Sequence, residues 1–517
     1  MNTLQITLGA RSDDDLRALV ERFGFYVHEH AFSRRSKGRV SVEAFGTPEQ
    51  IEVARQVSRE SARGGFSVSK PVDIGAQMAR LARRRTALPD RIADNLREPS
   101  RDKPGWHDAY EQIERNLLAN AGLVGPEWSR VFHLDMPTHG KGYKPIAVHM
   151  GTPIDSSKPT ALILGGVHGN ELIPPDVLCR LPGDIWNSIK VGSDLRFGRL
   201  TISAGDLRTM MKKINVIIVP CVNPDGRTAA LANLTAPKPD WAVGRKNARQ
   251  VDVNRNFDML WDAKSYFHPD VFKSDNVIGF TPDKNTFRGP SAASENETRN
   301  IVNLLDRNPS IRCLLDIHAG TGSPVVLYNW GIDQNGTDPA NRFPSAKGRR
   351  VIGLPGDAYR EFVRAKPDGE DLKGLAETMS QFGNATKTVQ WPSPWRPAQS
   401  FEGIYPTCAS SDDYAYGRHV VSSQKPKVYG FTAEIGTFQS SNWEHVTNRW
   451  TEVAAAVVGF LLKMSTIRWA APIRNAGTPA AGRPARKRAT AKKKAPPKAK
   501  VKRKAKKKSR SRGTQAA

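Results

Sequence analysis

The 517-residue sequence has little of several features that mark special classes of protein. Its four cysteines, Cys179, Cys221, Cys313 and Cys408, are far apart, which favours reduced, partly buried thiols over a disulfide framework. No apolar run approaches the roughly 20 residues of a membrane span, and Val453 to Leu462 is typical of the apolar part of a helix. The first residues do not resemble a secretory signal. We therefore expect a cytoplasmic protein without a membrane span.

Acidic residues are scarce relative to basic ones, with 51 Asp and Glu against 78 Lys and Arg and a net charge of +27. Residues 471–517 hold 18 of the positive charges and no acid, which leaves +9 for residues 1–470. Because this segment also lacks aromatic residues, we expect a disordered Lys/Arg-rich tail. Such a tail either binds nucleic acid or another polyanion through counterion release, or only keeps the protein soluble. The sequence leaves both interpretations open.

The remaining chain divides into a small and a large folded part. Residues 1–85 alternate short strand-like runs with amphipathic helical patterns and predict a small α+β domain, and residues 86–105 form a linker. Residues 106–470 contain long apolar strands separated by helices. This pattern predicts an α/β fold with a mixed, largely parallel sheet covered by helices on both faces. Residues 330–400, rich in Gly, Pro, Asp and Arg, are expected to form an extended loop or lid inserted in this domain.

Two apolar runs end in residues that suit a metal ion. Residues 161–165 lead through a glycine turn to His168 and Glu171, and residues 311–317 lead directly to His318. A catalytic zinc site takes three ligands from His, Glu, Asp or Cys and leaves one position open. The His-x-x-Glu spacing alone arises by chance, but ligands at the carboxyl ends of two strands can meet at one edge of a sheet. We predict that these three residues bind one zinc ion per chain.

Four further segments follow in one order, and each supplies a group that peptide hydrolysis needs. In the last of them Glu434 interrupts an apolar strand, where a carboxylate is costly unless it has a partner or a task. The segments are a strand and turn at 219–226, a basic loop at 244–249, the Asn254-Arg255 pair within 251–257, and the strand at 429–436.

In this order the motifs resemble those of the zinc metallocarboxypeptidase family, of the carboxypeptidase A and B type, over roughly residues 106–464. The resemblance implies that Glu434 is the general base, which takes a proton from the attacking water and returns it to the leaving amine. It also implies that Arg245 stabilises the developing oxyanion, with Arg249 as the fallback. The substrate would then be the C-terminus of a peptide or protein.

The resemblance also identifies residues that hold the substrate. Asn254 and Arg255 match the pair that grips the terminal carboxylate, because a guanidinium fork makes two parallel hydrogen bonds to that group. Tyr405 matches the mobile tyrosine that closes over the substrate, and Asp412 matches the residue that projects into the specificity pocket. A carboxylate there predicts a preference for basic C-terminal residues. The alternative is that Asp412 or Asp413 caps the turn through its own backbone.

One departure keeps other functions open. Asn170 stands between His168 and Glu171 where the pancreatic enzymes have arginine, and His-Gly-Asn-Glu also occurs in aspartoacylases and succinylglutamate desuccinylases. The alternatives are therefore an amino-acid deacylase, a murein-peptide amidase, or a polyanion-binding protein on an inactive peptidase domain. Some family members carry an inhibitory pro-segment, so residues 1–85 are either such a segment or a docking domain.

Overall fold

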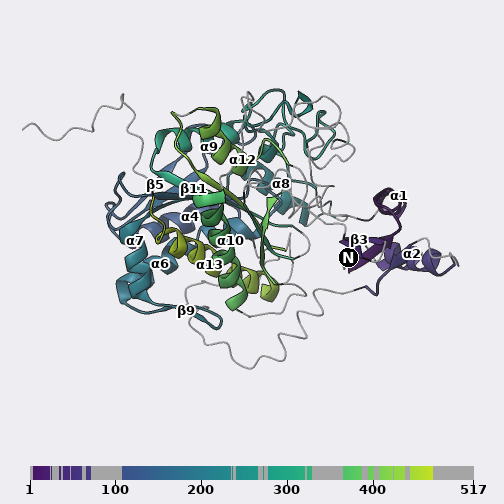
Figure 1. Cartoon of the computed structure of the whole chain (residues 1–517), viewed down its shortest axis with the longest axis horizontal. Coiled ribbons are helices and arrows are strands. Elements are labelled where there is room, and N and C mark those ends of the chain that lie inside the picture. Colours follow the sequence, from purple (N-terminus) through teal and green to yellow (C-terminus); the bar gives the residue numbers. More distant parts are fainter. Residues whose placement is uncertain are drawn as a thin grey trace, which may run out of the picture. The chain divides into compact units, whose positions relative to one another are not determined.

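A computed structural model shows a large α/β domain and a small α+β unit (Figure 1). The linker at 86–105, the tail at 471–517 and Tyr405 lie outside the residues that the structure describes. The described residues are 4–23, 25, 34–36, 39–46, 48–60, 66–71, 107–234, 236, 240, 242–265, 272, 278–320, 323–328, 365–386, 394–400, 407–422, 424–436 and 443–469.

An eight-stranded mixed sheet forms the centre of the large domain. Strands β14, β11, β7 and β10 run parallel to one another, whereas β6 and β5 continue the sheet with antiparallel pairs. The expected mixed, largely parallel sheet is therefore confirmed. The strand order is β13 (Arg396–Gln399), β12 (Val325–Tyr328), β14 (Tyr429–Glu434), β11 (Ile311–His318), β7 (Thr160–Gly165), β10 (Asn215–Val219), β6 (Ile146–Met150) and β5 (Ser129–His133).

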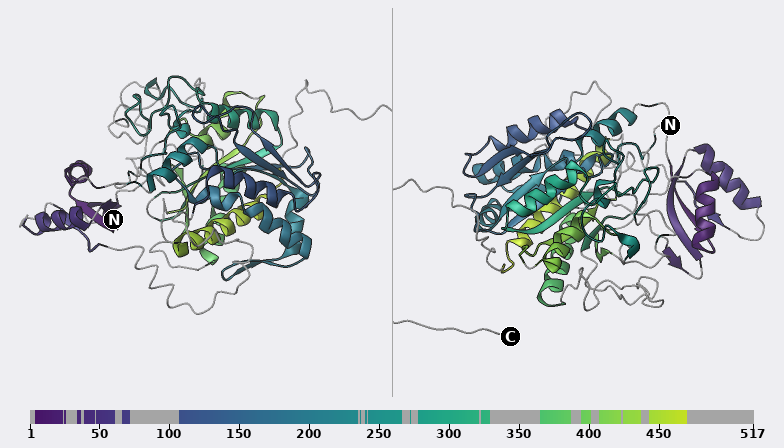
Figure 2. Two further views of the ribbon diagram at one scale, coloured as in Figure 1. Left: turned by 180° about the vertical axis from the view of Figure 1, so that it is seen from behind. Right: turned by 90° about the horizontal axis from the view of Figure 1, so that it is seen from above.

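Helices cover both faces of this sheet, as Figures 1 and 2 show. In β7, Ala161 and Ile163 join one apolar core and Leu162 and Leu164 the other, as the two-residue period of a strand requires. The central strands are largely apolar because both of their faces are buried, although β11 also contains Arg312, Asp316 and His318. The first core includes residues of α4 (Tyr110–Ala121), α5 (Ile173–Leu178), α6 (Leu181–Val191), α7 (Ala204–Lys213), α10 (Glu370–Ala385) and α13 (Trp443–Met464), and the second includes residues of α9 (Asn296–Arg307) and α12 (Ser411–Val421).

Shorter elements complete the large domain. A hairpin of β8 (Leu195–Phe197) and β9 (Leu200–Ile202) connects α6 to α7. Helix α8 (Pro224–Leu234) follows β10, and a single 3-10 turn spans Val253–Arg255. All four cysteines are buried and free, as the sequence predicted. Within the described part of the chain, no helix is long and apolar enough to cross a membrane.

The expectation of an extended loop over residues 330–400 is wrong for two parts of that segment. Residues 365–369 form a π-helical turn that continues into α10 at residues 370–385, and residues 396–399 form the edge strand β13. The helix forms because apolar residues recur at helical spacing and pack into the first core. Residues 329–364 and 387–393 lie outside the described residues. The fully buried apolar residues of α10 are Leu372, Leu375, Ala376 and Met379.

The N-terminal unit has its own sheet and core. Four strands pair in the order β2-β3-β1-β4, all antiparallel, and two helices accompany them. Residues Ile6, Leu8, Leu16, Leu19 and Ile51 belong to one buried cluster of this unit. The elements are β1 (Leu4–Ala10), α1 (Asp13–Phe23), β2 (Arg34–Ser36), β3 (Arg39–Gly46), α2 (Pro48–Glu60) and β4 (Ser67–Val68).

Candidate metal centre and active site

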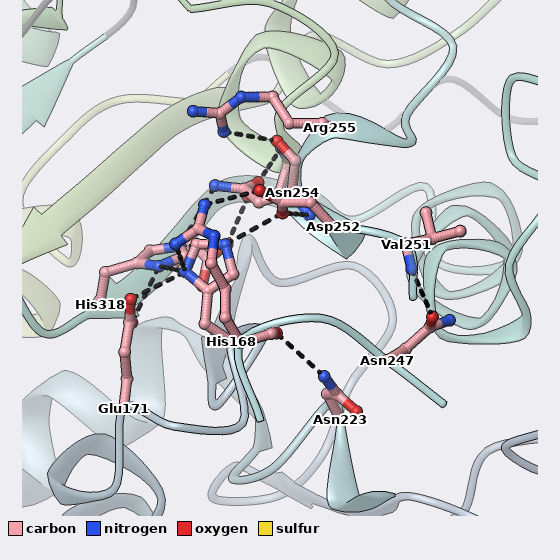
Figure 3. Close-up of polar contacts among 12 residues, drawn as sticks. His168, Glu171, Asn223, Asn247, Val251, Asp252, Asn254, Arg255 and His318 are labelled. Atoms are coloured by element: carbon pink, nitrogen blue, oxygen red, sulfur yellow. Dashed lines mark hydrogen bonds and ion pairs between the residues drawn. The ribbon is translucent and has the colours of Figure 1, made fainter. Parts of the chain in front are cut away.

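The predicted metal ligands and general base lie at the carboxyl ends of neighbouring parallel strands. His318 is the last residue of β11 and Glu434 the last of β14, and the two are register partners. His168 follows β7 after a turn at Gly166, whose φ of 58° suits glycine, and Glu171 comes three residues later. Figure 3 shows His168, Glu171 and His318 turned toward one another. The structure therefore brings all three predicted ligands together.

Three donor atoms converge between these side chains. His168 Nδ1 lies 2.8 Å from Glu171 Oε1 and 3.1 Å from His318 Nδ1. His318 Nδ1 lies 3.0 Å from Glu171 Oε2, and all three residues are buried. Donors about 2.0–2.1 Å from a tetrahedral zinc ion lie roughly 3.3 Å from one another. The two imidazoles and the carboxylate therefore fit one zinc ion.

The far nitrogen of each histidine faces a buried aspartate. His168 Nε2 lies 3.1 Å from Asp252 Oδ1, and His318 Nε2 lies 3.0 Å from Asp316 Oδ2. Such a carboxylate accepts the Nε2 proton and leaves the Nδ1 lone pair free for a metal. Neither aspartate was predicted from the sequence. Asp316 carried a usable signal, since it precedes His318 by two strand residues and so shares its face.

Opposite charges at the cluster set the directions of the pKa shifts. Burial alone would raise the pKa of Glu171, but His168 and His318 hold it below the usual value of a glutamate. Burial alone would lower the pKa of His318, but Asp316 and Glu171 hold it well above the usual value of a histidine. The cluster therefore favours an ionised carboxylate and a positive charge beside it.

Arg245 reaches the same cluster from the basic loop. Its Nη1 lies 3.2 Å from His168 Nδ1, and its Nη2 donates to Asp252 Oδ2 at 2.6 Å. Burial would raise the pKa of Asp252, but Arg245 and His168 bring it far below its usual value. Arg249, the fallback, has a 44% exposed side chain and lies 3.7 Å from Glu295 Oε1. The structure therefore places Arg245, rather than Arg249, beside a predicted zinc ligand.

Three glycines allow the ligand turn, α8 and the basic loop to pack backbone against backbone. A Cβ on Gly169 would lie 2.2 Å from the backbone nitrogen of Arg227. A Cβ on Gly226 would lie 2.4 Å from the carbonyl oxygen of Gly244, whose own φ is 87°. Side chains at these positions would push the segments apart, so the glycines fix how closely Arg245 approaches the ligands.

Asn254 and Arg255 follow Asp252 in a 3-10 turn behind His318. Asn254 Nδ2 lies 3.4 Å from His318 Nε2, and its Oδ1 accepts from the backbone nitrogen of Ser411 at 2.9 Å. The Arg255 side chain is buried, and its Nη1 donates to the carbonyl oxygen of Asn254 at 3.0 Å. Both residues are labelled in Figure 3. The two residues predicted to bind the substrate's terminal carboxylate therefore lie next to the predicted metal ligands.

Asp412 lies buried in the first turn of α12. Its Oδ1 accepts from the Ser410 hydroxyl at 2.5 Å, and Ser410 itself caps the helix by accepting from the backbone nitrogen of Asp413. Backbone hydrogen bonds from Asp412 and Asp413 also reach the Asp412 carboxyl, so Asp412 takes part in capping the turn together with Ser410. Burial raises the pKa of Asp412, and the nearby Asp316 carboxylate raises it further.

Two buried glutamates stand behind the basic loop at the start of α9. The Nδ2 of Asn247 donates to Glu295 Oε2 at 2.8 Å and to Glu297 Oε2 at 3.1 Å. Among the described residues, Oε1 of Glu297 has no hydrogen-bond partner. Burial, followed by the charges of Glu295 and Asp225, raises the pKa of Glu297 to about 7. Glu297 is therefore half protonated near neutral pH.

Comparison with known proteins decides the family. The pattern of the zinc carboxypeptidase family matches residues 139–471, which is more than half of the chain. The chain belongs to the zinc carboxypeptidase family. The resemblance seen in the sequence motifs is confirmed, and the matched region includes every predicted metal ligand.

Curated carboxypeptidases match parts of the chain. Carboxypeptidase B of Helicoverpa zea is 27% identical over 251 residues, which are 47% of this chain and 51% of that protein. Carboxypeptidase E of Caenorhabditis elegans is 31% identical over 164 residues, which are 30% of this chain and 31% of that protein. The chain thus spans about half the length, or less, of these relatives.

Solved structures share the fold of this chain. Carboxypeptidase A from Helicoverpa armigera has a TM-score of 0.52 at 18% identity, covering 89% of this chain and 98% of that one. Thrombin activatable fibrinolysis inhibitor has a TM-score of 0.55 at 15% identity, with the same coverage. At these identities the likeness shows the fold alone.

The ligand set predicts the metal content of the purified protein. We expect about one zinc ion per chain, and His318→Ala should lose it because two ligands form an incomplete site. Asp252→Asn should keep three ligands but bind zinc about 10- to 100-fold more weakly, because His168 loses its charged partner. Metal analysis and competition with a chelator measure both effects. The control is Asp206→Asn, an exposed position on α7, and full zinc content in His318→Ala would remove His318 from the ligand set.

Glu297 predicts how stability depends on pH. The pKa of Glu297 is raised from 4.5 to about 7 by folding. Between these two pH values the folded protein therefore holds a proton that the unfolded chain has released. The free energy of unfolding should therefore fall as the pH rises from the unfolded-state pKa toward and past the folded-state pKa. Glu297→Gln cannot ionise, and its stability relative to wild type should rise with pH by roughly 3 kcal/mol.

Urea unfolding between about pH 5 and pH 8 measures this difference. Glu377→Gln, at a 44% exposed side chain on α10, controls for the general loss of a carboxylate. A stability difference between Glu297→Gln and wild type that stays constant over the whole range would contradict a raised pKa at Glu297.

Proposed function

We propose that the protein is a zinc-dependent metallocarboxypeptidase that hydrolyses the C-terminal peptide bond of its substrate. The observation that carries the proposal is the pairing of Glu434 with His318 on adjacent parallel strands. A carboxylate that can act as a base thereby lies beside the three predicted metal ligands. Arg245 reaches the same cluster, with its Nη1 3.2 Å from His168 Nδ1. Membership of the zinc carboxypeptidase family supports the same reading.

The side chains divide the chemistry among themselves. A zinc ion held by His168, Glu171 and His318 would supply Lewis acidity to the scissile carbonyl and lower the pKa of water. The carboxylate of Glu434 would take the proton from the attacking water and carry it to the leaving amine. The Arg245 guanidinium, already held by a buried aspartate, would donate to the oxygen on which negative charge develops.

Asn254 and Arg255 would make the enzyme an exopeptidase. The Asn254 carboxamide lies next to His318, and Arg255 is the next residue of the same 3-10 turn. A guanidinium binds a carboxylate through two parallel hydrogen bonds, which selects a free C-terminus over an internal peptide bond. Zinc-loaded protein should therefore cleave peptides with a free terminal carboxylate and leave their C-terminally amidated forms intact.

Glu434→Gln tests the proposed base. The variant should keep its zinc but lose about 10²–10⁴-fold in kcat, since the amide cannot accept the proton. The measurement is kcat on a small peptide with zinc content verified, and Glu377→Gln on α10 is the control. Peptide hydrolysis by Glu434→Gln at the wild-type rate would remove Glu434 from the mechanism. Wild-type protein that cleaves only N-acyl amino acids or murein peptides would replace the proposal with the deacylase or the amidase.

We further propose that Asp412 selects basic C-terminal residues. Its carboxyl is buried and has a raised pKa, so the ionised form gains most from a cation that enters with the substrate. The Ser410 hydroxyl donates to the Asp412 carboxyl, which holds that carboxyl in a fixed place in the turn.

Asp412→Asn tests the specificity. Wild-type kcat/KM should be higher for a peptide ending in Arg than for matched peptides ending in Phe or Glu. The variant should lose about 10- to 150-fold of the ratio between Arg and Phe, since one interaction with a charged group is worth roughly 1.5–3 kcal/mol. Asp413→Asn, in the same helical turn, should keep the ratio. Wild-type preference for Phe, or an unchanged ratio in Asp412→Asn, would show that the assignment is wrong.

A further inference from the structure

The basic loop is built around one buried side chain. The Oδ1 of Asn247 accepts from the backbone nitrogens of Arg249 and Val251, each at 3.0 Å. The backbone of Asn247 also closes the loop, because its nitrogen donates to the Val251 carbonyl and its carbonyl accepts from Gln250, both at 2.9 Å. Gln250 has a φ of 61°, an uncommon conformation for a residue with a side chain. Asn247 therefore holds the loop in a shape that it would rarely adopt alone.

The other half of the Asn247 carboxamide ties the loop to α9. Both Nδ2 hydrogens are used, one toward Glu295 and one toward Glu297, and Asn247 is only 1% exposed. Because both glutamates are fully buried at the start of a helix, they are rigid acceptors. Hydrogen bonds to buried carboxylates are stronger than those between neutral groups, and losing one is costly. The loop therefore has a fixed anchor outside itself.

Both ends of this loop carry groups of the predicted active site. Arg245 begins it and contacts His168, and Asp252 follows it and contacts both Arg245 and His168. The Asn223 side chain adds a bond of 3.3 Å to the Arg245 carbonyl, which fixes the backbone but not the guanidinium (Figure 3). Where the guanidinium lies depends on the spacing of Arg245 and Asp252, and that spacing depends on the loop.

We propose that Asn247 is a positioning residue that holds Arg245 and Asp252 at the metal ligands. Its role in the reaction rests on the function proposed for Arg245 above. Without the carboxamide, two backbone N–H groups lose their acceptor and each of the two buried glutamates loses one donor, so the loop must rearrange. A displacement of about 1 Å at a catalytic group costs up to about 100-fold in rate. Asn247→Ala should therefore lower kcat about 10- to 100-fold and change KM little.

A double-mutant cycle distinguishes positioning from general structural support. If Asn247 acts mainly through Arg245, then Asn247→Ala should lower kcat much less in an Arg245→Ala background than in the wild-type protein. All variants are assayed in saturating zinc with their metal content verified. Asn300→Ala is the matched control, because Asn300 is also a buried asparagine and lies on α9, the helix to which the loop is tied. Its Oδ1 accepts from the backbone nitrogen of Met136, and its Nδ2 donates to the Met136 carbonyl. Asn300→Ala should lower stability without interacting with Arg245→Ala.

Hydrogen exchange tests the anchor without using activity. The amides of Arg249 and Val251 should lose protection in folded Asn247→Ala and keep it in Asn300→Ala. Unchanged protection, or a full additional loss of kcat in the Arg245→Ala background, would overturn the positioning role. Wild-type protein without peptidase activity would instead overturn the proposed function, and the exchange result alone would then decide whether Asn247 anchors the loop.

Discussion

Three electron-pair donors lie within about hydrogen-bond distance of one another on almost fully buried side chains, and the rest of the site depends on this convergence. The donors of His168, Glu171 and His318 repel one another unless a positive charge stands between them. The parallel strands β7 and β11 fix the two histidine positions, because strand register leaves little freedom at the strand ends. The aspartates Asp252 and Asp316 then fix the orientation of each ring, so the lone pairs cannot turn away.

The same sheet explains why much of the fold and the reacting residues could be predicted from sequence. Central strands that are buried on both faces appear as continuous apolar runs, and a polar residue that ends or interrupts such a run is conspicuous. His318 and Glu434 both have this signal, and the strands pair them directly. Helix α9 was equally visible because its apolar residues follow the helical period. His168 and Glu171 needed the turn after β7 as well, where glycine permits a positive φ.

The supporting residues were hidden because their importance arises only after folding. Asp252 and Asn247 are satisfied by partners that the chain brings from other segments, and such contacts leave no periodicity. Helix α10 was missed for another reason, since its apolar spacing lies within a segment rich in glycine and proline. Asp412 was identified by resemblance, and only the structure shows that Ser410 also caps that turn.

Zinc K-edge X-ray absorption of the purified, full-length protein tests the metal centre most directly. We predict a first shell of nitrogen and oxygen donors only, at about 2.0–2.2 Å, with outer-shell scattering from two imidazoles. All four cysteines are buried and none belongs to the ligand cluster, so no sulfur should be seen. A sulfur shell near roughly 2.3 Å, or scattering from fewer than two imidazoles, would contradict a centre built from His168, Glu171 and His318.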